Sequence, residues 1–137
     1  MSEDLIIAYT DGAARGNPGP AGVGVYIVDQ HDLVLVETQR YLGEATNNVA
    51  EYQALLLALD QLEMLNAKNV IIRSDSQLMV RQLNGEYRVK NSGIRPLFQE
   101  AKIRLCEFPN VTLEHIPRDQ NKEADRLANQ AIDEQAG

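Results

Sequence analysis

Four acidic residues stand beside apolar or small residues, at positions where regular secondary structure is expected to begin or end. They are Asp11, Glu51, Asp75 and Asp125. An ionised carboxylate that leaves water costs several kcal/mol unless a positive charge meets it. Two divalent cations would balance four converging carboxylates, and carboxylate oxygens are the ligands that such cations prefer. The four residues therefore predict a metal-dependent enzyme of phosphoryl transfer.

Each of the four positions also has an explanation that needs no site. Asp11 precedes a glycine, and this dipeptide is typical of turns. Glu51 lies three residues after Asn48 and fits a capping box at the start of a helix. Asp75 and Asp125 would be favoured at the start of the helices expected around them. These explanations do not require the four side chains to meet, so their convergence would favour a site.

The hydrophobic pattern predicts strands alternating with helices. Short apolar runs predict five strands, at residues 5–10, 23–28, 33–41, 70–74 and 111–116. Apolar residues at spacings of three and four predict four helices, at residues 48–65, 76–83, 94 or 96 to about 106, and 121–134. The sequence DQHD between the second and third strands is expected to form a hairpin turn.

This order of elements indicates an α/β fold. The first three strands are expected to pair antiparallel and the last two to extend a mixed five-stranded sheet flanked by helices. Residues 1–137 are expected to form a single domain. Asp11 would share the inward row of its strand with Ile7 and Tyr9. If the first and fourth strands are parallel neighbours, Asp11 and Asp75 lie at adjacent carboxyl ends, where open sheets bind ligands.

Composition limits the partners that the chain can have. Its formal net charge is −7, which by itself argues against nucleic-acid binding. Residues 81–104 nevertheless hold six basic and two acidic residues, which fits either a binding surface or an ordinary solvated one. The single cysteine, Cys106, excludes an intrachain disulfide. Without an apolar run of membrane-spanning length or a signal peptide, we expect a cytoplasmic protein with no membrane partner and no obligate protein partner.

Around the four acids, the sequence resembles the type 1 ribonuclease H family. The motifs that carry the resemblance are YTDGAARGNPGPAG around Asp11, TNNVAEYQALLLAL around Glu51, RSDSQL around Asp75 and NKEADRLAN around Asp125. They follow one another in the family's order and span nearly the whole chain. The resemblance implies the family's fold, a mixed five-stranded sheet of three antiparallel strands followed by parallel ones, in a single ribonuclease H-like catalytic domain.

The resemblance also implies an activity and a metal. Asp11, Glu51, Asp75 and Asp125 would be both catalytic residues and ligands of two Mg²⁺ ions, for which Mn²⁺ would substitute. The enzyme would be an endonuclease that hydrolyses the RNA strand of an RNA–DNA hybrid duplex. Its products would carry 5′-phosphate and 3′-hydroxyl ends.

Seven further residues match positions that bind substrate in the family: Gly12, Asn17, Thr46, Asn47, Asn48, Gln77 and Arg118. Asn47, Asn48 and Gln77 would contact RNA 2′-hydroxyls or base edges, and the 2′-hydroxyl is what distinguishes RNA from DNA. Asn17 and Thr46 would lie near the DNA backbone. Asn17 also suits a turn and Thr46 a helix cap.

The chain departs from the family before its last acid. Many members carry a histidine there on a flexible loop, whereas His115 falls within the predicted fifth strand. Arg118 occupies the shortened loop instead. We expect its guanidinium to act electrostatically on a phosphate, because arginine cannot serve as a base near neutral pH.

Two other classes of function stay open on the sequence alone. One is a non-catalytic nucleic-acid-binding module, although such a module would have no reason to keep all four acids. The other is a nuclease or phosphatase acting on a different phosphate substrate, such as double-stranded RNA. Metal ions stabilise any in-line displacement at phosphorus, so the acids would serve these reactions equally well.

Overall fold

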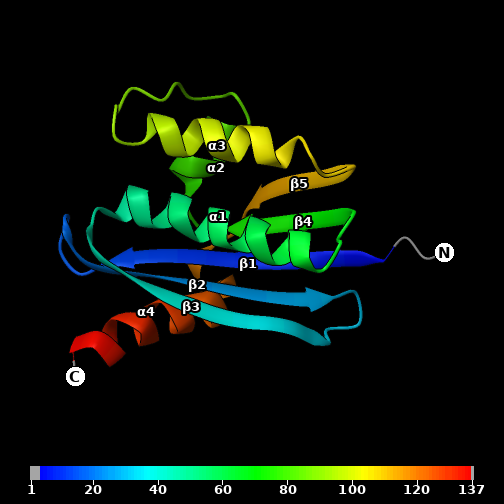
Figure 1. Cartoon of the computed structure of the whole chain (residues 1–137), viewed down its shortest axis with the longest axis horizontal. Helices are drawn as coiled ribbons and strands as arrows, with labels where there is room; N and C mark the ends of the chain where they lie inside the picture. Colours follow the sequence, from blue (N-terminus) through cyan, green and yellow to red (C-terminus); the bar gives the residue numbers. More distant parts are fainter. Residues whose placement is uncertain (1–3, 137) are drawn as a thin grey trace.

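The computed structural model describes residues 4–136 and contains one mixed sheet of five strands (Figure 1). The strands are β1 (Leu5–Ala14), β2 (Gly19–Asp29), β3 (Val34–Ala45), β4 (Asn69–Ser74) and β5 (Asn110–His115). Their order across the sheet is β3-β2-β1-β4-β5. The first three strands pair antiparallel, whereas β4 runs parallel to β1 and β5 parallel to β4. The predicted mixed sheet is therefore confirmed.

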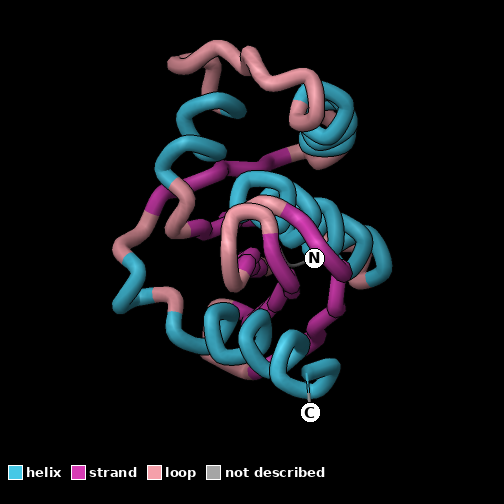
Figure 2. The backbone as a smooth tube through the Cα atoms, turned by 90° about the vertical axis from the view of Figure 1, so that its left-hand side faces the viewer, coloured by secondary structure: helices cyan, strands magenta, loops and turns pink. Residues whose placement is uncertain are grey.

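Helices cover both faces of the sheet. α1 (Asn47–Met64) lies on one face with α2 (Gln77–Leu83) and α3 (Arg95–Leu105) on the same side, and α4 (Lys122–Ala136) lies on the other (Figures 1 and 2). A short 3₁₀ helix, η1 (Arg118–Gln120), leads into α4. Within residues 4–136, no helix combines the length and the apolar character needed to cross a membrane.

The main core lies between α1 and the sheet. Tyr52, Leu55 and Leu59 of α1 are fully buried, together with Val25 and Ile72 of the strands beneath them. α3 packs beside α1, so α1 is buried around much of its circumference rather than along one stripe. This burial holds the start of α1 in a fixed place relative to the end of β1.

The structure corrects the predicted end of the first strand. The first strand was predicted to end at residue 10, before a turn at Asp11 and Gly12, and the second to begin at residue 23, but β1 continues to Ala14 and β2 begins at Gly19. Small residues are needed in these strands because helices approach the sheet closely. A Cβ atom at Gly12 would overlap the backbone of Ala50 in α1, and one at Gly24 would overlap the backbone of Ala124 in α4.

The row of β1 that includes Asp11 faces α4 rather than the main core. Asp11 pairs with Gly24 in β2, so the two residues point to the same face, and a Cβ atom on Gly24 would meet α4. Ala8, which alternates with the Tyr9 and Asp11 row, belongs to the core beneath α1. Asp11 is buried, as its place on the inward row predicted, but the row faces α4 because both faces of the sheet are covered and the pattern of the strand does not say by which helix.

Gly24→Ala is expected to destabilise the protein through its effect on α4. The new Cβ atom would lie 2.7 Å from the backbone nitrogen of Ala128, and backbone cannot rotate away as a side chain can. Overpacking of this kind costs about 1–3 kcal/mol, which urea unfolding would measure as a lower free energy of unfolding. Gly93→Ala, at an exposed position, is the control and should change stability by about 0.5 kcal/mol or less. Equal losses in the two variants would contradict this account of α4 packing.

Candidate active site

Three of the four predicted acids meet at one end of the sheet. Asp11, Glu51 and Asp75 each offer a carboxylate oxygen, and these oxygens all lie within 4.8 Å of one another. Thr10 of β1 pairs with Ser74 of the parallel strand β4, so the residues that follow them, Asp11 and Asp75, lie side by side. The switch from antiparallel to parallel pairing at β1 thus creates the point where the acids gather.

Glu51 reaches the other acids from α1, and its position depends on Gly12. A Cβ atom at Gly12 would collide with Ala50 and lie 2.5 Å from the backbone nitrogen of Glu51. Thr46 is the N-cap of α1, and its Oγ1 accepts a hydrogen bond from the backbone N–H of Val49 at 3.2 Å. Glu51 therefore stands beyond the capping-box position, and the capping explanation for this residue does not hold.

Asp125 lies beside this group, in the first turn of α4. It lines a cleft of about 450 Å³ together with Asp11, Glu51 and Asp75. One of its carboxylate oxygens accepts a hydrogen bond from Asn129 at 3.2 Å and lies 3.8 Å from the guanidinium of Arg118. The structure thus places Asp125 next to the other three acids, with side-chain contacts of its own that the other three do not share.

Burial and the neighbouring charges raise the pKa values of Asp11 and Glu51. Burial raises the pKa of Asp11 to about 9, and the neighbouring carboxylates of Asp75, Asp125 and Glu51 add to the rise. Burial also raises the pKa of Glu51 to about 7; a hydrogen bond with Ser76 opposes this rise and the charge of Asp75 adds to it. Crowded carboxylate oxygens repel one another when they are ionised, and a hard divalent cation would neutralise their charge. The residues present therefore fit a metal site.

Several residues expected to contact substrate hold the framework of the site together. The side-chain oxygen of Asn17 accepts a hydrogen bond from the backbone N–H of Asn47 at 3.0 Å. The side-chain oxygen of Asn47 in turn accepts one from the backbone N–H of Ala14 at 3.0 Å. Thr46 caps α1, as the sequence alternative allowed. These bonds fasten the connection between β1 and β2 to the start of α1.

Asn48, Gln77 and Arg118 are placed differently. The Oδ1 atom of Asn48 is buried and has no hydrogen-bond partner within residues 4–136. Gln77 is exposed at the first position of α2, directly after its N-cap Ser76. Arg118 is exposed and lines the cleft. His115 lies within the fifth strand, as predicted: it is the last residue of β5, and it is exposed.

Arg15 and Asn129 also line the cleft, and neither was predicted from the sequence. Both lie inside motifs that the sequence analysis quoted, DGAARGNPG and NKEADRLAN. Asn129 follows Asp125 by one helical turn, and this spacing was the available signal. Arg15 had none, because an arginine in a glycine-rich connection resembles any exposed charge.

Asp11→Asn is expected to stabilise the metal-free protein and to flatten its pH dependence. The raised pKa values mean that the folded state holds protons that the unfolded chain releases. Stability without metal therefore falls as pH rises from 3.8, the ordinary value for Asp11, to about 9. Removing this carboxylate should raise the free energy of unfolding at pH 8 by roughly 2–4 kcal/mol.

Urea unfolding in EDTA at pH 5 and pH 8 would measure this difference. Glu86→Gln, at an exposed position between α2 and α3, is the matched control and should keep the pH dependence of the wild type. A wild-type protein that becomes more stable over this pH range would show that the acids are not crowded as described.

Comparisons with known proteins agree with this geometry. The family model described as reverse transcriptase-like matches residues 9–131. Ribonuclease HI of Halobacterium salinarum is 40% identical over 127 residues, which cover 93% of this chain and 64% of that protein. The bifunctional protein Rv2228c of Mycobacterium tuberculosis is 40% identical over 129 residues, which cover 93% of this chain and 35% of that protein. The chain thus spans about a third of one relative and just under two thirds of the other.

A solved structure matches over nearly the full length of both chains. The crystal structure of LC11-RNase H1 in complex with an RNA/DNA hybrid has a TM-score of 0.92 and 47% sequence identity to this chain. The match covers 96% of this chain and 99% of that one. The fold, the acidic cluster and the extent of these matches agree. The chain therefore belongs to the type 1 ribonuclease H family.

Proposed function

We propose that this protein is an endoribonuclease that hydrolyses the RNA strand of an RNA–DNA hybrid with the help of divalent metal ions. The observation that carries the proposal is the meeting of Asp11, Glu51 and Asp75 within 4.8 Å, in a cleft that Asp125 also lines. The 47% identity to a ribonuclease H1 bound to RNA/DNA hybrid supports the choice of substrate. Residues 1–137 would act as one catalytic domain.

Four carboxylates would hold the ions. Asp11, Glu51 and Asp75 form one group of donors, and Asp125, whose side chain contacts that of Asp11, would complete a second with it. Mg²⁺ is the proposed ion, with Mn²⁺ as a substitute, since both take oxygen ligands. When bound, such ions lower the pKa of water and stabilise charge on the scissile phosphate. Binding would also lower the pKa values of Asp11 and Glu51, so that both carboxylates are ionised at neutral pH.

The bond changes of the proposed reaction are those of an in-line displacement. A water molecule attacks the phosphorus atom and the 3′-oxygen of the preceding nucleotide leaves, which gives 5′-phosphate and 3′-hydroxyl ends. Asp11, Glu51 and Asp75 would be in position before substrate arrives, because β1, β4 and α1, which place them, are packed in the core. Such preorganisation avoids rearrangement during the reaction.

Polar residues around the acids would recognise the hybrid. Asn48 comes three residues before Glu51 and has a side-chain oxygen without a partner in residues 4–136, and Gln77 comes two residues after Asp75 and has an exposed amide. Groups of this kind can bond the 2′-hydroxyls that only the RNA strand carries. Asn47 would contact the RNA strand as well, and its bonds to Ala14 and Asn17 would hold it in place. Asn17 and Thr46 would lie near the DNA backbone.

Residues 81–104, the basic segment, would contribute less positive charge to substrate binding than their six basic residues suggest. Arg104 forms ion pairs with Asp60, Glu63 and Glu100. The cations of this segment that remain exposed include Arg88, Lys90 and Arg95. With a net charge of −7 and few exposed cations, the chain would bind hybrid weakly, and the affinity would fall further as the salt concentration rises.

Cleavage of an end-labelled RNA–DNA hybrid tests the proposal. The wild type should cut the RNA strand in Mg²⁺ and stop in EDTA, and Asp11→Asn should lower the rate by about 10³-fold, since a lost metal ligand removes several kcal/mol of transition-state stabilisation. Glu86→Gln should cut at the wild-type rate. Double-stranded RNA, duplex DNA and a small phosphate ester complete the panel. Hybrid binding without cutting in either metal would instead favour a non-catalytic binding module.

Arg118→Ala is expected to lower kcat/KM on the hybrid by about 10-fold. Arg118 lies 3.8 Å from Asp125 at the edge of the cleft, where its charge would act on a phosphate. The slope of log kcat/KM against log salt should become shallower by about one unit. Lys122→Ala removes an exposed charge at the start of α4 and is the control. Unchanged kcat and KM in the Arg118 variant would exclude a role in the reaction.

A further inference from the structure

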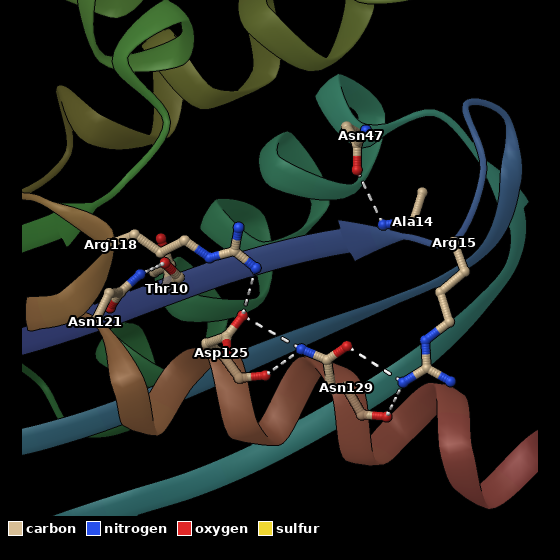
Figure 3. Close-up of polar contacts among 8 residues, drawn as sticks. All are labelled: Thr10, Ala14, Arg15, Asn47, Arg118, Asn121, Asp125 and Asn129. Carbon is tan, nitrogen blue, oxygen red and sulfur yellow. Dashed lines mark hydrogen bonds and ion pairs between the residues drawn. The ribbon is translucent and has the colours of Figure 1, made fainter.

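A chain of polar contacts links Arg15, after β1, to Asp125 in α4 (Figure 3). The guanidinium of Arg15 donates to the side-chain oxygen of Asn129 at 3.2 Å and to its backbone oxygen at 3.4 Å. The amide nitrogen of Asn129 donates to the carboxylate of Asp125 at 3.2 Å and to its backbone oxygen at 3.0 Å. The contacts therefore run in one direction, from guanidinium to amide to carboxylate.

The direction follows from the chemistry of the three groups. A guanidinium has donors and no acceptor, so the oxygen of the Asn129 amide must face Arg15. The NH₂ group of the same amide then points back along the helix to Asp125 (Figure 3). The backbone and carboxylate oxygens of Asp125 only accept hydrogen bonds, so they favour the same orientation of the amide as Arg15 does.

Arg15 is itself held in place from two sides. Its Nη1 atom forms an ion pair with Asp133 at 2.6 Å, and its backbone N–H donates to the carbonyl oxygen of Pro20 at 2.8 Å. The side chains of Arg15 and Asp133 are 44% and 64% exposed. An ion pair as exposed as that of Arg15 and Asp133 adds little to the free energy of unfolding. Its effect here is to fix the place of the guanidinium group.

We propose that Asn129, oriented by Arg15, is a positioning residue that holds the Asp125 carboxylate in place for metal binding. The inference rests on the proposed function, because it gives Asp125 a metal to bind. Asp125 differs from Asp11, which is buried at the end of the sheet. Asp125 is partly exposed, with a side chain 32% accessible, and it comes from a different helix on the other face of the sheet. Loss of such a supporting contact typically costs 10–100-fold in metal affinity or activity.

Asn129→Ala and Arg15→Ala test the inference, with Gln130→Ala as a control at the exposed next position of α4. On hybrid, kcat should fall by about 10–100-fold in Asn129→Ala, with KM within about two-fold of wild type. The Mg²⁺ concentration that gives half-maximal activity should rise. Without substrate, the increase in Tm that Mg²⁺ or Mn²⁺ causes should be smaller than in the wild type, while the Tm in EDTA stays close to wild type.

The double variant separates positioning from independent roles. If Arg15 acts through Asn129, the two substitutions together should lower kcat no further than Asn129→Ala alone. Multiplied losses, or a higher KM at unchanged kcat in Arg15→Ala, would show that Arg15 contacts substrate directly and would overturn the proposal. So would equal Tm increases with metal in the wild type and both variants.

Failure of the proposed ribonuclease function would give results different from those of a failed positioning role. A wild type that gains Tm with metal but does not cut hybrid would contradict the ribonuclease activity alone. The positioning role would still be supported if both variants gained less Tm from metal. A wild type that cuts hybrid with variants indistinguishable from it would support the activity and overturn the positioning role.

Discussion

The crowding of carboxyl groups where they are partly removed from water is the constraint on which the rest of this structure depends. Asp11 is 7% exposed and lies beside Asp75 and Glu51, which are half-buried, so the chain places three carboxyl groups where water solvates them poorly. No local interaction favours that arrangement, and it must be imposed by packing elsewhere. The parallel pairing of β1 with β4 and the burial of α1 supply that packing. The stability given up at the acids is thus offset in the core beneath α1.

Glycines allow the two helix layers to contribute acids to the same point. Gly12 lets the start of α1 approach β1 on one face, and Gly24 lets α4 approach β2 on the other. A methyl group at either position would push a helix outward, and with it Glu51 or Asp125. Gly12 and Gly24 therefore shorten the distance between helix and sheet rather than provide backbone flexibility. Neither has a left-handed backbone conformation. The geometry of the cleft thus depends on the absence of a side chain at these two positions.

Periodic features of the fold could be predicted from the sequence, whereas contacts between layers could not. The helix that carries Glu51 and the antiparallel first three strands follow from spacing and turn residues, and the structure confirms them. The extension of β1 to Ala14 was missed because the residues that break strands in isolation are here required by helix packing. The link from Arg15 to Asn129 was missed because it joins residues 114 positions apart, which no local pattern records.

The four acids are consequently held by two different means. Asp11, Glu51 and Asp75 are placed by backbone elements packed in or against the core, so their positions change only if the core changes. Asp125 projects from α4 into a partly open cleft, and its carboxylate is held by Asn129 and approached by Arg118. A group held by side chains can be displaced at far lower cost than one held by packed backbone. The side of the cleft that Asp125 lines is therefore where substrate, metal and nearby surface residues can most readily affect one another.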